Sequence, residues 1–210
     1  MVFRDRQDAG QKLAQALTKF KGDKTAVLLA LPRGGVAVAA EIARQLKLPL
    51  DLVVPRKIGA PSNPEYAIGA ITETGEGIMN ETEVASVDRL WLKREMAKEK
   101  KEAGRRLAVY RGKRPPLDLA GKTVILVDDG VATGFTMRAA IASVRARKPK
   151  KIVVAVPHGA GDSIALLNKE ADEVVVLETP VFYGAVGAFY ESFPQVEDDE
   201  VTTIMKEFET

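Results

Sequence analysis

Short apolar runs alternate with segments of helical periodicity along most of the chain. The apolar runs have the length of buried strands and read, in chain order, TAVLLA, LDLVVPRKIG, EYAIGAITE, KTVILVDD, PKKIVVAVPHG and DEVVVLETP. Residues 8–20, 36–45, 136–147 and 163–169 carry apolar positions at the spacing of one helical face. Because the strands are apolar on both faces and alternate with helices, we predict a mostly parallel sheet covered by helices on both sides.

A charge-rich segment between Asn80 and Tyr110 interrupts this alternation. It combines good helix formers with charges of both signs, which is typical of a solvated helix with one apolar face. The apolar positions of that face are Val87, Leu90, Trp91, Met96 and Leu107. We predict a helical insertion over residues 80–114, packed against the sheet or against a second subunit. Glutamates interleaved in KEKKEAGRR argue against a nucleic-acid patch, which needs a face of one sign.

The composition is that of a globular domain and excludes several kinds of site. The 210 residues, 46% of them hydrophobic, suffice for a single domain, with a core over about residues 24–178 and a tail over 179–210 that we expect to form a hood. The 31 basic and 29 acidic residues nearly cancel, so charge points to neither nucleic acid nor membrane. Cysteine is absent, and neither a signal-peptide core nor an apolar run of about 20 residues occurs, so we expect a cytoplasmic protein.

Two adjacent acids, Asp128 and Asp129, follow the apolar run that ends at Val127. Ligands of an open parallel sheet bind at the carboxyl ends of its strands, so these carboxylates are expected at a binding edge. They suit a group that donates hydrogen bonds, such as a sugar diol, or a metal ion carried by the substrate. A helix cap with a solvated loop explains the acids and the following glycine alone equally well.

The loop after the acids is suited to a phosphate. Its residues are Ala132, Thr133, Gly134, Phe135 and Thr136. They offer backbone N–H groups and two hydroxyls at the start of a helix, where anions bind. A ribose 5-phosphate carries both a diol and a phosphate, so the two adjacent sites together predict such a ligand.

The complete string VILVDDGVATGFT resembles the signature of type I phosphoribosyltransferases for phosphoribosyl pyrophosphate (PRPP), in which apolar residues precede two acids and a Thr-Gly-x-Thr loop. The resemblance covers about residues 28–177 and implies a Rossmann-like fold. It implies that Asp128 and Asp129 bind the ribose and that residues 132–136 bind the 5′-phosphate. LETP, FY and the aromatic-acidic ending are similar to an uncharacterised bacterial group of this family.

The segment LPRGG resembles the pyrophosphate loop of the same family. Gly34 and Gly35 would let backbone N–H groups approach the phosphates, and Arg33 would add a guanidinium. The resemblance also implies a cis peptide bond between Pro32 and Arg33. An ordinary turn at the end of a strand explains LPRGG alone equally well.

The residues Arg56 and Lys57 begin a loop rich in Pro, Ser and Asn. They resemble the Arg-Lys pair of the mobile loop in orotate-type members, which implies contacts with the pyrophosphate and closure over the reacting centre. The loop is shorter than in many members, and both residues are also consistent with ordinary surface charges.

The acceptor site is the least specified part. Members that use 6-oxopurines have an acid directly before the Thr-Gly of the loop, and Ala132 at that place disfavours hypoxanthine and guanine. Acceptor contacts are expected from the end of the fifth strand and from the tail: Val156, Pro157, His158, Phe182 and Tyr183, with Phe189 or Tyr190 as further stacking rings. A histidine that satisfies a backbone group and aromatic residues that belong to the core are the alternatives.

The resemblance implies an Mg²⁺-dependent pentosyltransferase that moves the phosphoribosyl group of PRPP to a small nitrogenous acceptor, a nucleobase, and releases pyrophosphate. Its catalytic residues would be Arg33, Arg56, Lys57, Asp128 and Asp129. Asp128 would contact the metal indirectly, through substrate and water, and a homodimer is expected. A non-catalytic PRPP-binding or regulatory module is the alternative. A phosphoacceptor receiver domain is disfavoured, because the fifth strand ends in Pro-His-Gly rather than lysine.

Overall fold

Five parallel strands form the central sheet, in the order β2-β1-β6-β7-β8. The computed structural model describes residues 2–209. The strands are β1 (Ala26–Ala30), β2 (Leu50–Leu52), β6 (Thr123–Val127), β7 (Lys151–His158) and β8 (Glu173–Glu178). Every residue of β1, β2 and β6 is buried, as expected of strands covered on both faces. The predicted fold class is confirmed.

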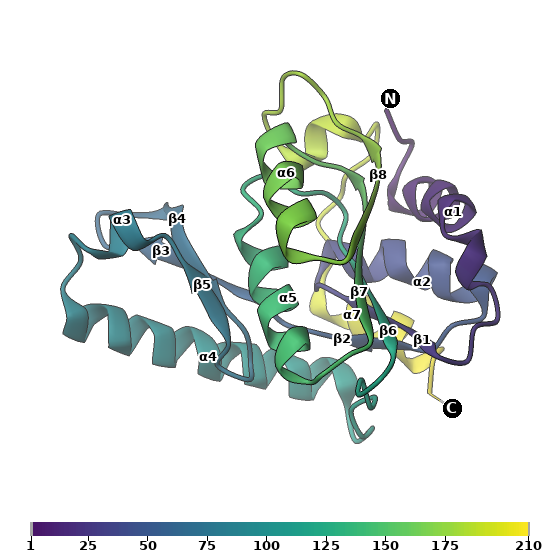
Figure 1. Cartoon of the computed structure of the whole chain (residues 1–210), viewed down its shortest axis with the longest axis horizontal. Coiled ribbons are helices and arrows are strands. Elements are labelled where there is room, and N and C mark those ends of the chain that lie inside the picture. Colours follow the sequence, from purple (N-terminus) through teal and green to yellow (C-terminus); the bar gives the residue numbers. More distant parts are fainter. Residues whose placement is uncertain (1, 210) are drawn as a thin grey trace.

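Helices cover both faces of this sheet (Figure 1). Alternate residues of each strand face opposite sides, so Leu28 belongs to one hydrophobic cluster and Leu29 to the other. The first cluster is covered by α1 (Arg6–Ala16), α2 (Gly34–Leu46) and α7 (Asp198–Lys206), and the second by α5 (Phe135–Ala146) and α6 (Gly161–Glu170). The four helices predicted from periodicity correspond to α1, α2, α5 and α6.

A second, antiparallel sheet contains β3 (Arg56–Ala60), β4 (Asn63–Ile71) and β5 (Gly77–Met79), and Figure 1 shows it projecting to one side of the central sheet. The prediction that LDLVVPRKIG is one strand and EYAIGAITE a strand of the central sheet is wrong. The first splits into β2 and β3 around Pro55, which has no backbone N–H to donate. Only two residues separate β3 from β4, and so short a connection permits only a hairpin.

The charged segment forms α3 (Glu81–Val84) and the long helix α4 (Arg89–Arg111). Asp88 caps α4, with its carboxylate accepting from the Trp91 N–H at 2.7 Å. Near its start α4 packs on a cluster that contains Ile58, Ile68 and Ile71 of the antiparallel sheet. The other end of α4 packs on the central sheet, where Tyr110 is buried.

Four of the five predicted apolar positions of this segment contact a core, and the fifth does not. Val87, Trp91 and Met96 pack on the antiparallel sheet, and Leu107 packs on the central one. Leu90 packs on neither sheet, and its side chain is 65% exposed.

After β8 the tail crosses the carboxyl edge of the central sheet, where Tyr190 contacts Asp129. It then continues to α7, which packs on the same face of the sheet as α1 and α2. The tail contains the 3₁₀ turn η2 (Val186–Phe189). Another 3₁₀ turn, η1 (Thr18–Phe20), follows α1. Phe3 donates its N–H to the Phe189 carbonyl at 2.8 Å, and a β-bridge joins Phe3 to Tyr190. The segment before α1 therefore contacts the part of the tail that includes η2 and Tyr190. Between residues 2 and 209, no helix has the length and apolarity of a bilayer span.

We predict that Ile68→Ala lowers the free energy of unfolding by about 2–4 kcal/mol, because it opens a cavity at a side chain that is only 1% exposed. The matched change Leu90→Ala is expected to cost less than about 0.5 kcal/mol. Denaturant unfolding followed by the fluorescence of Trp91, the single tryptophan, measures both. Equal effects of the two changes would contradict the packing described for α4.

Candidate active site

The loops that follow β1 and β6 contact each other at the carboxyl edge of the sheet. The two strands pair in register from Ala26 with Thr123 to Ala30 with Val127, and the Leu31 N–H continues the ladder by donating to the Val127 carbonyl at 2.9 Å. The peptide bond between Pro32 and Arg33 is cis, as the resemblance implied. The segment LPRGG therefore lies directly beside the two acids.

Glycine is required at this contact for steric reasons. A Cβ on Gly35 would lie 2.8 Å from the Val127 carbonyl oxygen and 2.9 Å from the Asp128 Cα. A Cβ on Gly34 would lie 1.8 Å from Oδ2 of Asp129. All three distances are shorter than real Cβ contacts. The loops can therefore approach each other this closely because residues 34 and 35 have no side chain.

The Asp129 carboxylate forms a buried ion pair with Arg6 of α1. Arg6 Nε donates to Oδ2 at 2.8 Å, and the two side chains are 10% and 13% exposed. Arg6 Nη1 donates to the Pro194 carbonyl at 2.7 Å, and its guanidinium lies 3.7 Å from the centre of the Phe193 ring. The Tyr190 hydroxyl donates to the backbone carbonyl of Asp129 at 2.5 Å. Residues of α1 and of the tail thus both hold Asp129.

The neighbouring carboxyl, Asp128, has a different environment. Its Oδ1 accepts from the Asp129 N–H at 2.8 Å. Burial raises the pKa of Asp128 well above its usual value, and the negative charge of Asp129 raises it further. A carboxyl in this situation is stabilised in its ionised form by any cation or hydrogen-bond donor that a ligand brings.

The predicted phosphate loop lies at the N-terminus of α5. Gly134 caps this helix in the left-handed region, with φ of 77°. The Ser163 hydroxyl of α6 donates to the Ala132 carbonyl at 2.6 Å and fixes the start of the loop, while Thr133 remains exposed. The first N–H groups of a helix have no partner within it, so Phe135 and Thr136 can present theirs to an anion.

His158 lies within an aromatic cluster beside this loop. The side chain is fully buried, and its ring centre is 4.7–5.9 Å from those of Phe3, Tyr183, Phe189 and Tyr190. Nδ1 is 2.9 Å from the Tyr183 hydroxyl. Burial lowers the pKa of His158 to about 4, so the imidazole is neutral at ordinary pH.

The predicted acceptor residues are only partly brought together. His158 and Tyr183 are in contact, and the charges of Asp129 and Asp128 contribute to a raised pKa of Tyr183, after the larger effect of burial. Val156 and Pro157 are buried in the strand, whereas the Phe182 side chain is 91% exposed. Core packing, the alternative for the aromatic residues of the tail, describes Tyr190 and not Phe182, whose role as an acceptor contact stays a prediction.

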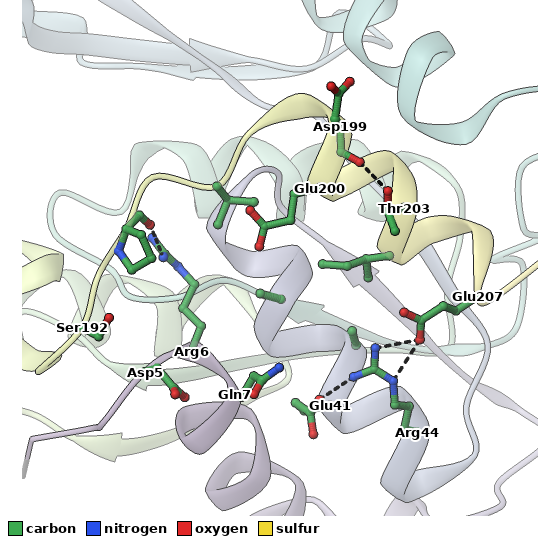
Figure 2. A pocket seen from close by; sticks show the side chains of 15 residues that line it. Asp5, Arg6, Gln7, Glu41, Arg44, Ser192, Asp199, Glu200, Thr203 and Glu207 are labelled. Carbon is green, nitrogen blue, oxygen red and sulfur yellow. Dashed lines mark hydrogen bonds and ion pairs between the residues drawn. The ribbon is translucent and has the colours of Figure 1, made fainter.

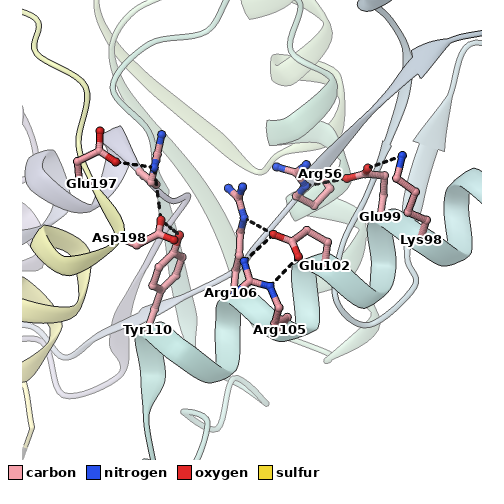
Figure 3. A network of polar contacts seen from close by, with 10 residues as sticks. Arg56, Lys98, Glu99, Glu102, Arg105, Arg106, Tyr110, Glu197 and Asp198 are labelled. Atoms are coloured by element: carbon pink, nitrogen blue, oxygen red, sulfur yellow. Dashed lines mark hydrogen bonds and ion pairs between the residues drawn. The ribbon is translucent and has the colours of Figure 1, made fainter.

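Arg33 is engaged by acids at the start of α7. Its Nη1 lies 3.3 Å from Oε2 of Glu197 and 3.4 Å from Oδ1 of Asp198. Tyr110 of α4 donates to the same Asp198 oxygen at 2.6 Å (Figure 3). Burial, and then this hydrogen bond, raise the pKa of Tyr110 to about 12.

Arg56 and Lys57 lie on β3, outside the central sheet. Arg56 Nε donates to Glu99 Oε2 of α4 at 2.8 Å, and Glu99 is a buried carboxylate (Figure 3). Arg56 is thus held by α4, while the glycine loop, the two acids and the phosphate loop form one continuous edge. Arg6 was missed, because nothing in the sequence distinguishes it from other surface cations near the first helix. Tyr190 was expected as a stacking ring for the acceptor, and its hydrogen bond to the backbone of Asp129 was not foreseen.

A cavity of about 610 Å³ lies next to this edge, between α1, α2 and α7 (Figure 2). Arg6 forms part of its wall, and Arg44 pairs there with Glu207 at 2.7 Å and with Glu41. Further carboxylates lining it are Asp5, Asp199 and Glu200. So many acids repel a phosphorylated ligand, and the cavity therefore does not replace the loops described above as the phosphate site.

A parallel α/β sheet with a diacid and a glycine loop at its carboxyl edge defines a class of nucleotide- and sugar-phosphate-binding proteins. The phosphoribosyl transferase domain family matches residues 5–191, and the chain belongs to this family.

Known proteins similar to the chain include relatives from bacteria and archaea. It is 44% identical over 206 residues to "Putative phosphoribosyl transferase Rv0571c" of Mycobacterium tuberculosis strain H37Rv, over 97% of this chain and 46% of that protein. The chain thus spans about half the length of the curated relatives it matches. It is 40% identical over 65 residues to the ribose-phosphate pyrophosphokinase of Pyrococcus furiosus, over 30% of this chain and 23% of that protein. The crystal structure of TT1426 from Thermus thermophilus is 44% identical, with a TM-score of 0.84 and 99% of each chain covered.

We predict that Gly34→Ala lowers the free energy of unfolding by about 1–3 kcal/mol, because the added Cβ overlaps the Arg6–Asp129 pair. Gly104→Ala is the matched control. Gly104 lies within α4 with nothing near the position of a Cβ, so this change should stabilise the protein by about 0.5–1 kcal/mol. Thermal and denaturant unfolding of both variants test the contrast, which a neutral Gly34→Ala would refute.

We also predict that the imidazole resonances of His158, the single histidine, titrate near pH 4 in NMR spectra of the folded protein. The unfolded chain binds its proton near pH 6.5, so the unfolded state holds more protons between these values. His158 therefore makes stability fall by up to about 1.4 kcal/mol per pH unit as pH drops from 6.5 to 4. His158→Phe should remove this part of the pH dependence. A midpoint near 6.5 would show that the cluster is open to water.

Proposed function

We propose that this chain binds PRPP and transfers its 5-phosphoribosyl group to a nitrogen acceptor, with pyrophosphate as the second product. The carrying observation is the contact of LPRGG with the two acids, in which Gly34 and Gly35 lie against the side chain of Asp129 and the backbone of Asp128. A ligand that spans this edge meets phosphate-binding glycines, acids and a helix N-terminus in succession. PRPP carries a pyrophosphate, a diol and a 5′-phosphate in the same succession.

In this proposal the binding roles follow the order of groups along the edge. Residues 132–136 hold the 5′-phosphate by backbone N–H groups and the hydroxyls of Thr133 and Thr136. Asp128 and Asp129 accept hydrogen bonds from the ribose hydroxyls. Residues 32–35 hold the pyrophosphate, with Arg33 as its cation.

The reaction is a displacement at the anomeric carbon. The acceptor nitrogen forms a bond to this carbon while the bond to the pyrophosphate oxygen breaks, and pyrophosphate leaves with the electron pair. Positive charge develops on the ribose, and the neighbouring carboxylates stabilise it electrostatically. The acceptor nitrogen then loses its proton to solvent. No nucleophile of the protein is needed.

Mg²⁺ fits the residues that are present. Bound to phosphates, this ion uses one or two protein carboxylates and takes its other ligands from substrate and water. Within residues 2–209 no group of three or more histidines or acids could hold a metal ion by itself. Asp128 and Asp129 supply the one or two carboxylates that an ion shared with the substrate needs. Asp128 would face the ion through substrate and water, and the ion would supply charge neutralisation of the leaving pyrophosphate. A nucleobase acceptor, a homodimer and a cytoplasmic location stay predictions.

A non-catalytic PRPP-binding module is the second candidate. Arg33 is paired with Glu197 and Asp198, and Arg56 with Glu99, so two of the three proposed pyrophosphate cations have acidic partners. If these pairs persist when ligand binds, the ligand is held without stabilisation of the leaving group.

Calorimetric titration with PRPP, with and without Mg²⁺, tests the proposal. We expect micromolar, Mg²⁺-dependent binding, and a loss of at least about tenfold in Asp128→Asn, which retains the shape of the side chain but removes its charge. Asp118→Asn changes an exposed acid at the opposite end of β6 and is the matched control, with unchanged affinity expected.

The outcomes separate the two candidates. Release of pyrophosphate in the presence of nucleobases or amines identifies an enzyme, whereas tight binding without release across these acceptors favours the binding module. Folded protein that does not bind PRPP would contradict both.

A further inference from the structure

Arg6 connects three separate segments of the chain at the proposed ribose site. It is the first residue of α1, and the Asp129 carboxylate that it contacts lies 123 residues further along the chain. Its second hydrogen bond goes to the carbonyl of Pro194 in the tail, and the face of the guanidinium lies on the Phe193 ring. One side chain therefore joins α1, the loop after β6 and the tail.

This geometry fixes the orientation of the Asp129 carboxylate. A guanidinium is planar and its donors point in set directions, so hydrogen bonds from Nε and Nη1 together leave it little freedom. The Tyr190 hydroxyl holds the backbone of the same Asp129. Because Oδ2 accepts from Arg6, the other oxygen, Oδ1, is the one available in this orientation to accept from a ligand hydroxyl.

The pyrophosphate loop packs against this same pair. A Cβ on Gly34 would lie 1.8 Å from Oδ2 of Asp129 and 2.9 Å from Nε of Arg6. The charge of Arg6 also lowers the pKa of Asp128, in opposition to the burial and to the Asp129 charge that raise it. Arg6 thus acts on both acids without lying in either of the sequence motifs.

We propose that Arg6 is a positioning residue for the ribose, which orients Asp129 toward one ribose hydroxyl and couples this orientation to the position of tail residues 190–194. The inference rests on the proposed function and deepens it, since it states which part of PRPP depends on α1 and the tail. Arg6 itself does not contact the reacting atoms.

The test compares ligands that carry different parts of PRPP. Arg6→Gln is titrated with ribose 5-phosphate, which has the diol and the 5′-phosphate, and with inorganic pyrophosphate, which has neither. We expect ribose 5-phosphate and PRPP to bind at least about tenfold more weakly than to the unaltered protein, and pyrophosphate affinity to change less than about twofold. A general structural defect would weaken all three ligands together.

Arg4→Gln is the matched control. Arg4 lies two residues away in the same segment, its side chain is 72% exposed and forms an ion pair with Asp8 at 3.2 Å, and its loss should leave all three affinities unchanged. Arg6→Lys retains the charge, but a single ammonium cannot reproduce the directed pair of hydrogen bonds, so it should still show the selective loss for ribose 5-phosphate. Arg6→Lys also serves if Arg6→Gln fails to fold.

Phe193→Leu extends the test to a residue outside the ion pair. The Phe193 side chain is 37% exposed, so its replacement should leave the fold intact while freeing the guanidinium from the ring. A selective loss of ribose 5-phosphate affinity in this variant supports the coupling to the tail, and an unchanged affinity refutes it.

Two results would refute the proposed role of Arg6 and leave the proposed function intact. Unchanged ribose 5-phosphate affinity in folded Arg6→Gln or Arg6→Lys, with normal PRPP binding by the unaltered protein, would refute the role of Arg6 alone. Equal losses for ribose 5-phosphate and pyrophosphate would do the same. Failure of the unaltered protein to bind PRPP or ribose 5-phosphate would instead remove the proposed function and this inference together.

Discussion

The parallel pairing of β1 with β6 is the constraint on which the arrangement of the site depends. Because their register continues from Val127 to the N–H of Leu31, the loops that leave these strands begin side by side. Glycines at 34 and 35 then permit the loop after β1 to touch the acids after β6. A shift of one residue in this pairing would turn the side chains of one strand to the opposite face and offset the two loops, so the sheet itself determines the site geometry.

Those parts of the molecule that depend on local patterns could be predicted from the sequence. Buried strands are apolar on both faces, and loops that bind phosphate need glycine and hydroxyl residues within a few positions, so the central sheet and residues 128–136 are visible locally. The Arg6–Asp129 pair is not visible in this way, because its partners lie 123 residues apart and no local pattern marks Arg6. The second sheet was missed because the second half of β4, residues 67–71, is as apolar as a central strand, and only the two-residue connection to β3 reveals a hairpin.

The environments of the predicted acceptor residues differ in ways that the sequence does not show. The sequence left open whether His158, at the end of β7, contacts a ligand or satisfies a backbone group, and the structure places its ring among Phe3, Phe189 and Tyr183. Tyr183 and Phe182 are adjacent aromatic residues with opposite environments, one against His158 and the other in solvent. The sequence shows that aromatic residues are present, and only the path of the tail shows which of them lies inward.

The helix α4 packs on both sheets and joins them as one rigid element. Glu99, which binds Arg56, and Tyr110, which binds Asp198, are separated on this one helix by eleven residues, or about 16 Å of rigid rise. Asp198 in turn contacts Arg33. A tilt of the antiparallel sheet that moved α4 as a rigid body would therefore also displace the Asp198 carboxylate beside Arg33. Arg56 of one sheet and Arg33 of the other would then move together.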